Sequence, residues 1–232
     1  MKRILLVTLL FLSLMVCFTS PAWAGGVEDF EAGGKAYDAG NYDEAIRLYT
    51  KAIASGELSG EQLSRAYGFR GVVWDKKGNY DRAIADYTKV IEIVPKDPDL
   101  YYIRGVAWLG KGDFGKAIAD LTKAIELNPK DAQAYNKRGF AWRRKGDYDR
   151  AIADYTKAIE IDPRFTEAYN ERGFVWRKKG DYDRAIADYT RAIEINPNDY
   201  LAYNERGLAW QAKGDYDKAK ADYAKRDELM EE

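Results

Sequence analysis

Three kinds of side chain in the stretch RGFAWRRKGDYDRAIADYTKAIEIDP, residues 138–163, could take part in chemistry. The triplet Asp147-Tyr148-Asp149 offers carboxylate oxygens to a metal ion, and the run from Arg143 to Lys145 offers cations to an anionic partner. Tryptophan and tyrosine add flat apolar surfaces of the kind that line ligand sites. The first question is which of these features the fold itself requires.

The acidic triplet does not have the pattern of a metal loop. A calcium loop needs oxygen ligands at alternate positions, a glycine at the sharp bend and a distant glutamate. Here Gly146 precedes the triplet and a helical pattern follows at once. We therefore interpret Asp147 as the N-cap of a helix, and we expect neither a metal nor a cofactor.

The composition also argues against catalysis. The chain has no histidine, and its single cysteine, Cys17, lies in an N-terminal segment that we expect to be cleaved, so the mature chain lacks the usual base, imidazole ligand and thiolate nucleophile. No phosphate loop, nucleophile elbow or zinc-protease motif is present. Two opposed carboxylates could still hydrolyse a glycoside, but the acidic residues recur in repeated columns and no single pair stands out. We expect a protein that is not an enzyme and has no catalytic residues.

The N-terminal segment has the pattern of a secretory signal peptide. Lys2 and Arg3 precede an apolar run over residues 4–18, and Ala22-Trp23-Ala24 forms a small-residue cleavage signal. We predict a signal peptide over residues 1–24 with cleavage after Ala24. The protein is then exported, to a bacterial periplasm or to the medium.

Two alternatives remain for this segment. An uncleaved membrane anchor is one, although the run would span only roughly 22 Å as a helix, against a hydrocarbon core of about 30 Å. A lipid-modified Cys17 is the other, but Val16 before it is larger than such a site usually accepts. The signal peptide explains the segment best.

Cleavage would leave a chain without cysteine and with a small negative charge. The whole chain has 37 basic and 38 acidic residues, and the leader removes two basic residues and no acidic one. The remaining charge of −3 gives no general attraction to nucleic acid. Without thiols no disulfide forms, so packing must stabilise the fold.

The quoted stretch recurs 34 residues later as RGFVWRKKGDYDRAIADYTRAIEINP, and the windows 132–165 and 166–199 agree at 25 of 34 positions. Related copies surround Arg70, Arg104 and Arg206, and a divergent copy covers 33–53 with a longer exit loop. Such a period indicates a repeat architecture. The predicted copies are repeat 1 at 25–63, repeat 2 at 64–97, repeat 3 at 98–131, repeat 4 at 132–165, repeat 5 at 166–199 and repeat 6 at 200–232.

Each copy contains two helical patterns. In repeat 4 the first spans about residues 134–145 and stops at Gly146-Asp147, and the second spans about 148–161 and stops before Pro163, which cannot continue a helix. Neither helix can bury its apolar face alone. Stacked neighbouring pairs can, which predicts a one-dimensional solenoid.

The period, the glycine-then-aromatic order of the first helix and the Ala…Tyr…Ala…Pro order of the second resemble the tetratricopeptide repeat family. The resemblance covers residues 26–232 and five copies match well. It implies an all-α, right-handed superhelical solenoid of six helix-turn-helix repeats. In this family the first helices line a concave groove that binds peptides or partner helices.

Most of the conspicuous residues recur in the repeat and are explained by packing. Gly139 and Ala151 represent columns of small residues at helix–helix contacts, and tryptophan and tyrosine occupy columns of their own. Arg138 and Asp154 also recur, so we expect a structural ion pair between the two helices of each repeat. In repeat 6, Lys220 and Arg226-Asp227 replace apolar residues and predict a polar final helix.

The candidate binding residues are those on the groove stripe that the repeat does not dictate. In repeat 2 this stripe also carries Gly68, Val72 and Asp75, which we do not assign to the site. The front of the stripe is apolar, and the rear combines asparagine amides, phenylalanines and cations. The candidate residues are Phe30, Tyr37, Tyr102, Asn136, Phe140, Arg143, Arg144, Asn170, Phe174, Arg177, Lys178 and Asn204.

These residues predict a non-catalytic protein-interaction scaffold of the cell envelope. Its partner is a protein or peptide that presents an acidic stretch or a free C-terminus to repeats 4 and 5, and neither nucleic acid nor a small-molecule cofactor is expected. Three alternatives stay open. The cations could form an ordinary solvated helix face, the protein could be a homo-oligomeric structural component, or the aromatic stripe could bind carbohydrate.

Overall fold

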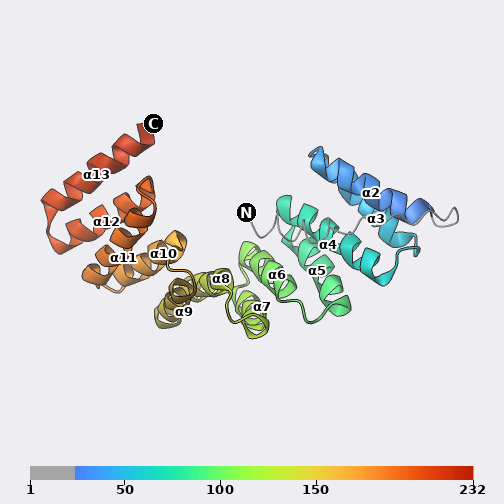
Figure 1. Cartoon of the computed structure of the whole chain (residues 1–232), viewed down its shortest axis with the longest axis horizontal. Helices are drawn as coiled ribbons and strands as arrows, with labels where there is room; N and C mark the ends of the chain where they lie inside the picture. The colour runs from blue at the N-terminus through green and yellow to red at the C-terminus, as the bar shows by residue number, and fades with distance from the viewer. Residues whose placement is uncertain (1–23, 232) are drawn as a thin grey trace. The chain divides into compact units, whose positions relative to one another are not determined.

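The computed structural model describes residues 24–231, which form twelve α-helices and no strand (Figure 1). The expected signal peptide lies outside the described residues except for Ala24. Over the described range, every helix is too short or too polar to cross a membrane. The prediction of an all-α helical solenoid is confirmed.

The chain forms two compact units, and we describe each by itself. The described part of unit 1 is residues 24–128 and that of unit 2 is residues 129–231. Unit 1 contains α2 (Ala24–Asp38), α3 (Tyr42–Ala54), α4 (Gly60–Lys76), α5 (Tyr80–Ile93), α6 (Pro98–Lys111) and α7 (Phe114–Leu127). Unit 2 contains α8 (Ala132–Arg144), α9 (Tyr148–Ile161), α10 (Thr166–Lys178), α11 (Tyr182–Ile195), α12 (Tyr200–Lys213) and α13 (Tyr216–Glu231).

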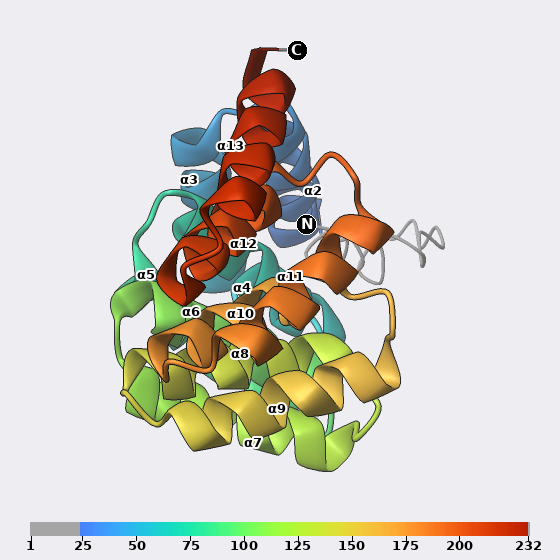
Figure 2. The same cartoon turned by 90° about the vertical axis from the view of Figure 1, so that its left-hand side faces the viewer.

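Within each unit the helices pair in chain order and consecutive pairs stack. In unit 2, α8 packs on α9, α10 on α11 and α12 on α13, while α9 also contacts α10 and α11 contacts α12. The first helix of the middle pair, α10, touches both α8 and α12, so the three first helices lie side by side (Figure 2). They form one continuous face, and its side chains come from equivalent positions of three pairs.

The turn between the helices of a pair follows from glycine and aspartate. Gly146 has a φ of +82°, a conformation that glycine adopts without strain. The carboxylate of Asp147 accepts a hydrogen bond from the backbone N–H of Arg150 at 3.1 Å. The interpretation of Asp147 as an N-cap is therefore confirmed.

Glycine in the middle of each first helix permits close packing with a tyrosine or, at Gly105, with Leu121. A Cβ atom on Gly139 would lie 2.8 Å from Cε1 of Tyr155, and one on Gly173 would lie 2.9 Å from Cε1 of Tyr189. Both tyrosine side chains are completely buried. The predicted close contact of the glycine column is confirmed, and any larger residue there would displace a core ring.

The predicted arginine–aspartate pair is present in five helix pairs. Arg172 donates from Nε and Nη2 to the two carboxylate oxygens of Asp188 at 2.9 and 2.7 Å. Its Nη1 also donates to Oγ1 of Thr156 on the preceding pair at 2.9 Å, a contact that was not predicted. The other carboxylate pairs are Arg70 with Asp86, Arg104 with Asp120, Arg138 with Asp154 and Arg206 with Asp222.

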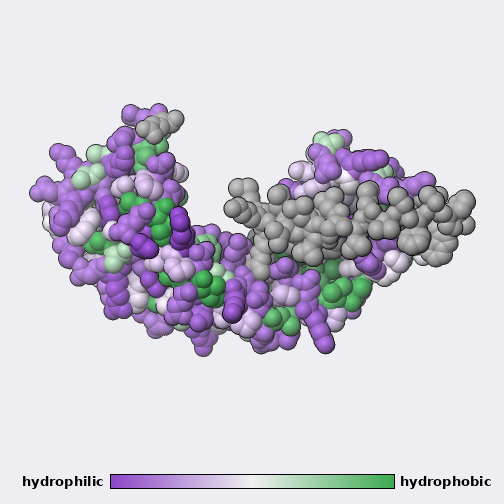
Figure 3. All heavy atoms as spheres, viewed as in Figure 1, coloured by the Kyte–Doolittle hydropathy of each residue, from purple (hydrophilic) through white to green (hydrophobic). Residues whose placement is uncertain are grey.

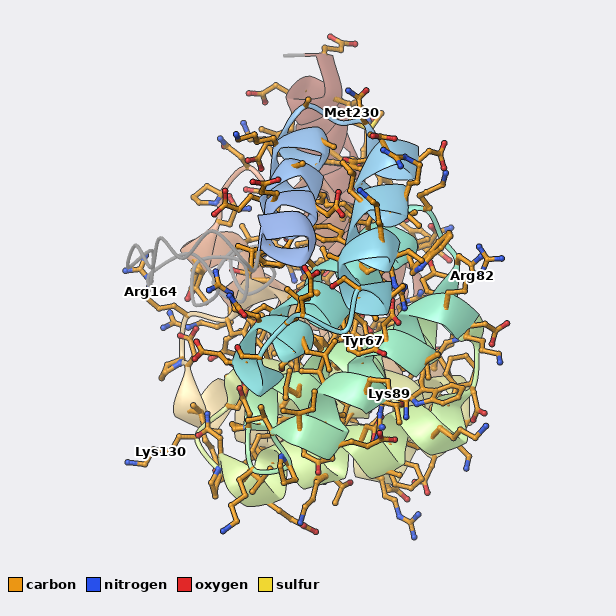
Figure 4. The ribbon with its side chains drawn as sticks, turned by 90° about the vertical axis from the view of Figure 1, so that its right-hand side faces the viewer. Tyr67, Arg82, Lys89, Lys130, Arg164 and Met230 are labelled. Carbon is orange, nitrogen blue, oxygen red and sulfur yellow. The ribbon has the colours of Figure 1, made fainter. Side chains whose placement is uncertain are left out.

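The five tryptophans in the described part of the chain are half-buried rather than enclosed. Each packs against its neighbouring helices and carries a cation over its ring from the second helix of its pair. The guanidinium carbon of Arg184 lies 4.0 Å from the ring centroid of Trp176, and that of Arg82 lies 4.4 Å from Trp74. Arg82 is on the outer side of α5 (Figure 4). The tryptophan column is therefore structural, with cation–π contacts in addition to apolar packing.

The final helix is polar, as its sequence predicts. Among its residues only Ala219 and Asp222 are buried. Arg226 turns back across the pair, and its Nη1 donates to the side-chain oxygen of Asn204 at 2.8 Å. A charge thus replaces the apolar contact that Ala192 makes at the equivalent position of α11.

The fold predicts a cost for enlarging the buried alanine column. Ala151 is fully buried, so Ala151→Phe should overpack the pair and lower the free energy of unfolding by ~1–3 kcal/mol. Urea denaturation measures the change. Ala153→Phe on the exposed side of the same helix is the control, and equal stability of the two variants would contradict the assigned packing.

The arginine–aspartate pair should show energetic coupling. We expect Arg138→Met and Asp154→Asn, made singly and together, to give a coupling of about 0.5–3 kcal/mol, because each single change leaves a part-buried charge unpaired. Chemical denaturation of the four proteins measures it. The exposed pair Lys157–Glu160 should show no measurable coupling, and strict additivity at Arg138 and Asp154 would contradict the structural role.

Candidate partner-binding faces

A stack of alternating rings and guanidinium groups crosses the first-helix face of unit 2. The guanidinium carbon of Arg143 lies 4.8 Å from the ring centroid of Phe140 and 4.9 Å from that of Phe174. The next arginine, Arg177, lies 5.4 Å from the same Phe174 ring. We call Phe140, Arg143, Phe174 and Arg177 the Phe–Arg stack. It brings together four predicted site residues from α8 and α10.

Each arginine of the stack is paired with a glutamate on the next first helix. Arg143 Nε lies 3.0 Å from Glu171 Oε2, and Arg177 Nη2 lies 2.8 Å from Glu205 Oε2. Burial raises the pKa of the Glu171 carboxyl, and the adjacent Arg143 charge opposes this rise. Glu171 and Glu205 are not among the residues predicted from the sequence. The signal for them was the spacing of 28 residues between each arginine and its glutamate.

The exposed edge of this face adds two further cations. Lys178 Nζ lies 5.4 Å from the Phe174 centroid, and the Arg144 guanidinium carbon lies 5.7 Å from that of Phe140. Both residues are exposed. The four predicted cations therefore face two carboxylates, and this part of unit 2 has an excess of positive charge. Hydrophilic residues cover much of the surface of unit 2 that Figure 3 shows.

The predicted asparagines use their amide donors inside the protein. Asn136 is 1% exposed, and its Nδ2 donates to Glu167 Oε1 at 3.0 Å. Asn170 Nδ2 donates to Asp199 Oδ2 at 2.7 Å. These bonds, like the contact of Asn204 with the last helix, link neighbouring helices. The asparagines support the faces on which a partner would lie, and Asn136 itself is enclosed.

The apolar first-helix stripe of unit 1 packs into an aromatic core cluster, where Phe30 and Phe69 meet the buried Tyr49 of α3. The ring centroids of Phe30 and Tyr49 are 5.7 Å apart, and Phe69 lies 5.9 Å from both of them. Tyr37 contacts the next aromatic cluster, and Tyr102 on α6 is buried with 6% exposure. Phe30 and Tyr37 are half-buried and Tyr102 is buried, so the apolar stripe that these predicted residues form is only partly open to solvent.

One carboxylate interrupts this apolar surface. Asp75 on α4 is half-buried, and over the described residues its side chain makes neither a hydrogen bond nor an ion pair. Burial raises its pKa, and the charge of Lys76 opposes the rise. From the sequence, Asp75 was expected on the stripe but was not assigned to the site. The sequence did show that Asp75 is charged where the neighbouring repeats have the uncharged Tyr37 and Leu109.

A shallow depression on the turn side of unit 2 has no catalytic arrangement. It is lined by the turn after α10 and the end of α12. Its two lysines are committed to ion pairs, Lys179 with Asp149 and Lys213 with Asp183. Over residues 24–231 no group of three or more potential metal ligands comes together.

Family models for the tetratricopeptide repeat match residues 31–98, 132–165, 166–199 and 188–221, and a further TPR repeat model matches 109–146. Together these matches cover most of the described chain. The chain belongs to the tetratricopeptide repeat family. No curated protein matches it in sequence.

Three solved structures illustrate the likeness. MamA is 31% identical with a TM-score of 0.66, over 69% of this chain and 94% of that one. A tetratricopeptide repeat protein from Parabacteroides merdae ATCC 43184 is 20% identical with a TM-score of 0.75, over 85% and 77% of the two chains. YrrB, a TPR protein described as having an unusual peptide-binding site, is 20% identical with a TM-score of 0.61, over 78% and 91%.

The unpaired carboxylate predicts a specific dependence of stability on pH. Because the pKa of Asp75 is higher in the folded protein, its ionised form costs stability at neutral pH, and this cost disappears as the group is protonated. Asp75→Asn should therefore be at least as stable as the wild type at about pH 7, with an advantage that shrinks toward about pH 4. Urea denaturation at both pH values measures this.

Glu61→Gln removes an exposed carboxylate from the same helix and is the matched control. Because Glu61 lies in the first turn of α4, where a carboxylate stabilises the helix dipole, its loss should lower the free energy of unfolding slightly at about pH 7, opposite in sign to Asp75→Asn. A lower stability of Asp75→Asn at neutral pH would show that Asp75 has a stabilising partner.

Proposed function

We propose that this protein is a non-catalytic protein-interaction scaffold of the cell envelope and that unit 2 binds an acidic segment or C-terminal carboxylate of its partner. The observation that carries the proposal is the Phe–Arg stack, where guanidinium groups lie between aromatic rings on a face with excess positive charge. The solenoid fold supports it, since its repeats present an extended surface made of equivalent positions.

The stack suits a carboxylate because its arginines keep donors available. A guanidinium has five N–H donors, and the ion pair between Arg143 and Glu171 is formed through Nε. The rings of Phe140 and Phe174 hold the guanidinium plane in place, so less side-chain entropy is lost when a partner binds. Two forked donors at one-repeat spacing favour an extended segment with more than one carboxylate.

The exposed cations would add long-range attraction. Arg144 and Lys178 lie at the edge of the stack, and both are exposed to solvent. Charges at the rim of an interface raise the association rate more than the affinity, and salt screens their effect. Binding of an acidic partner should therefore weaken as salt concentration increases.

The envelope location rests on the leader pattern of residues 1–24. The absence of cysteine from the rest of the chain is compatible with an oxidising compartment, because no stray thiol is present. A scaffold in such a compartment meets partners that carry exposed termini and acidic segments. Fractionation of cells that express the full chain tests this location.

The Phe–Arg stack predicts a charge-selective peptide interaction. Fluorescence anisotropy should show tighter binding of a glutamate-rich peptide than of its glutamine-rich counterpart. Phe140→Ala combined with Phe174→Ala should weaken binding of the glutamate-rich peptide by about tenfold or more, because the arginines lose the rings that hold them in place. Unchanged affinity in this double variant would overturn the assignment of the site.

The controls separate the site from overall charge. Lys157→Ala removes an exposed cation from α9, and it should leave the affinity unchanged. Arg144→Ala with Lys178→Ala should reduce the association rate and the salt dependence. A photo-crosslinker at position 178 should capture envelope partners that one at position 157 does not.

A further inference from the structure

One position of the repeat carries a different chemistry in each unit. It lies one or two residues before the end of the first helix, and every occupant but one is accounted for within the fold. Arg143 and Arg177 pair with glutamates, and Gln211 accepts a hydrogen bond from Tyr223 at 2.9 Å. Tyr37 and Leu109 are uncharged. Asp75 is the exception over the described residues, since it bears a charge without a partner.

The surroundings of Asp75 make an unpaired charge costly. Val72 and Tyr87 on either side belong to a buried apolar cluster, and Tyr37 and Ile103 pack against that cluster. Burial raises the pKa of Tyr87, and the negative charge of Asp75 contributes to the rise. A carboxylate among aromatic and aliphatic groups loses hydration and gains nothing from the fold in return.

Nearby cations do not compensate for it. Lys76 adjoins Asp75 in sequence, so the two side chains point in different directions around the helix, and its Nζ lies 5.7 Å from the ring centroid of Tyr37. Arg70, on the same helix, is committed to Asp86 and to Thr50. The guanidinium of Arg65 lies over Phe30 at 5.6 Å.

We propose that Asp75 is the anchor of a second recognition site, on unit 1, which takes a single lysine or arginine side chain from an otherwise apolar partner segment. This inference rests on the proposed scaffold function and names the partner chemistry of the other unit. The carboxylate binds the cationic head group through a charge-assisted hydrogen bond. Val72 and Ile103 contact the aliphatic stem, as apolar surfaces do for long cationic side chains.

A single carboxylate selects this occupant. A calcium or magnesium site needs several oxygen ligands, and over the described residues no group of three or more potential metal ligands comes together. A polybasic segment would gain little here, because the other stripe residues of unit 1, such as Val72 and Leu109, are uncharged. A partner segment with one cationic residue between apolar residues matches both the single carboxylate and its uncharged surroundings.

The test compares two peptide pools against the full chain. Both are short, with flanks drawn from valine, leucine, threonine and asparagine, and they differ only in a central lysine or its uncharged analogue norleucine. We expect the wild type to bind the lysine pool about tenfold or more tightly, the effect of one charge-assisted hydrogen bond. In Asp75→Asn this preference should disappear, and in the matched control Glu61→Gln it should persist.

Each outcome bears on a different statement. A lysine preference that survives in Asp75→Asn overturns the inference, and so does a wild type that binds both pools equally. The glutamate-rich peptide is measured on the same samples. If the glutamate-rich peptide binds but the lysine and norleucine pools bind with equal affinity, the scaffold function stands and the unit 1 site is wrong. If no peptide binds, both proposals fail.

Discussion

A guanidinium group that bonds to two helix pairs at once sets the spacing of this array. Arg172 donates hydrogen bonds to both carboxylate oxygens of Asp188 within its own pair and to Thr156 on the preceding pair. Arg104 and Arg206 repeat the arrangement within their units. Such part-buried charges accept little displacement, because any shift leaves a group unsatisfied. The bond therefore fixes how one helix pair lies on the next, where apolar packing alone would allow sliding.

Fixing the stacking in this way leaves the first-helix faces open to variation. Equivalent positions carry Asp75 in unit 1 and Arg143 and Arg177 in unit 2, on helices with the same supporting contacts. The backbone need not change for the charge of a face to reverse. This explains how near-identical repeats can present aromatic and acidic character in one unit and cationic character in the other, each suited to a different partner chemistry.

The sequence alone was sufficient for features that lie within one repeat. The helix pairs, the cap at Asp147, the close helix contact at Gly139 and the Arg138–Asp154 pair follow from local spacing and propensity. Contacts between repeats were not foreseen, because they depend on the stagger between neighbouring pairs. Asn136 was expected to face a ligand, and it is enclosed by the next pair. Glu171 and the isolation of Asp75 depend on the same stagger. Apart from Ala24, the leader lies outside the described residues, so the signal peptide remains a prediction.

The tryptophan column gives this protein a built-in set of optical reporters. One indole lies in each of five helix pairs, half-buried, under a cation from the same pair. Because the five environments are nearly equivalent, emission from the intact chain sums over the array. A chain that keeps a single tryptophan would report the opening of one pair. In a linear array, each pair is stabilised mainly by its immediate neighbours. Such single-tryptophan chains would therefore show whether the terminal pairs unfold before the central ones.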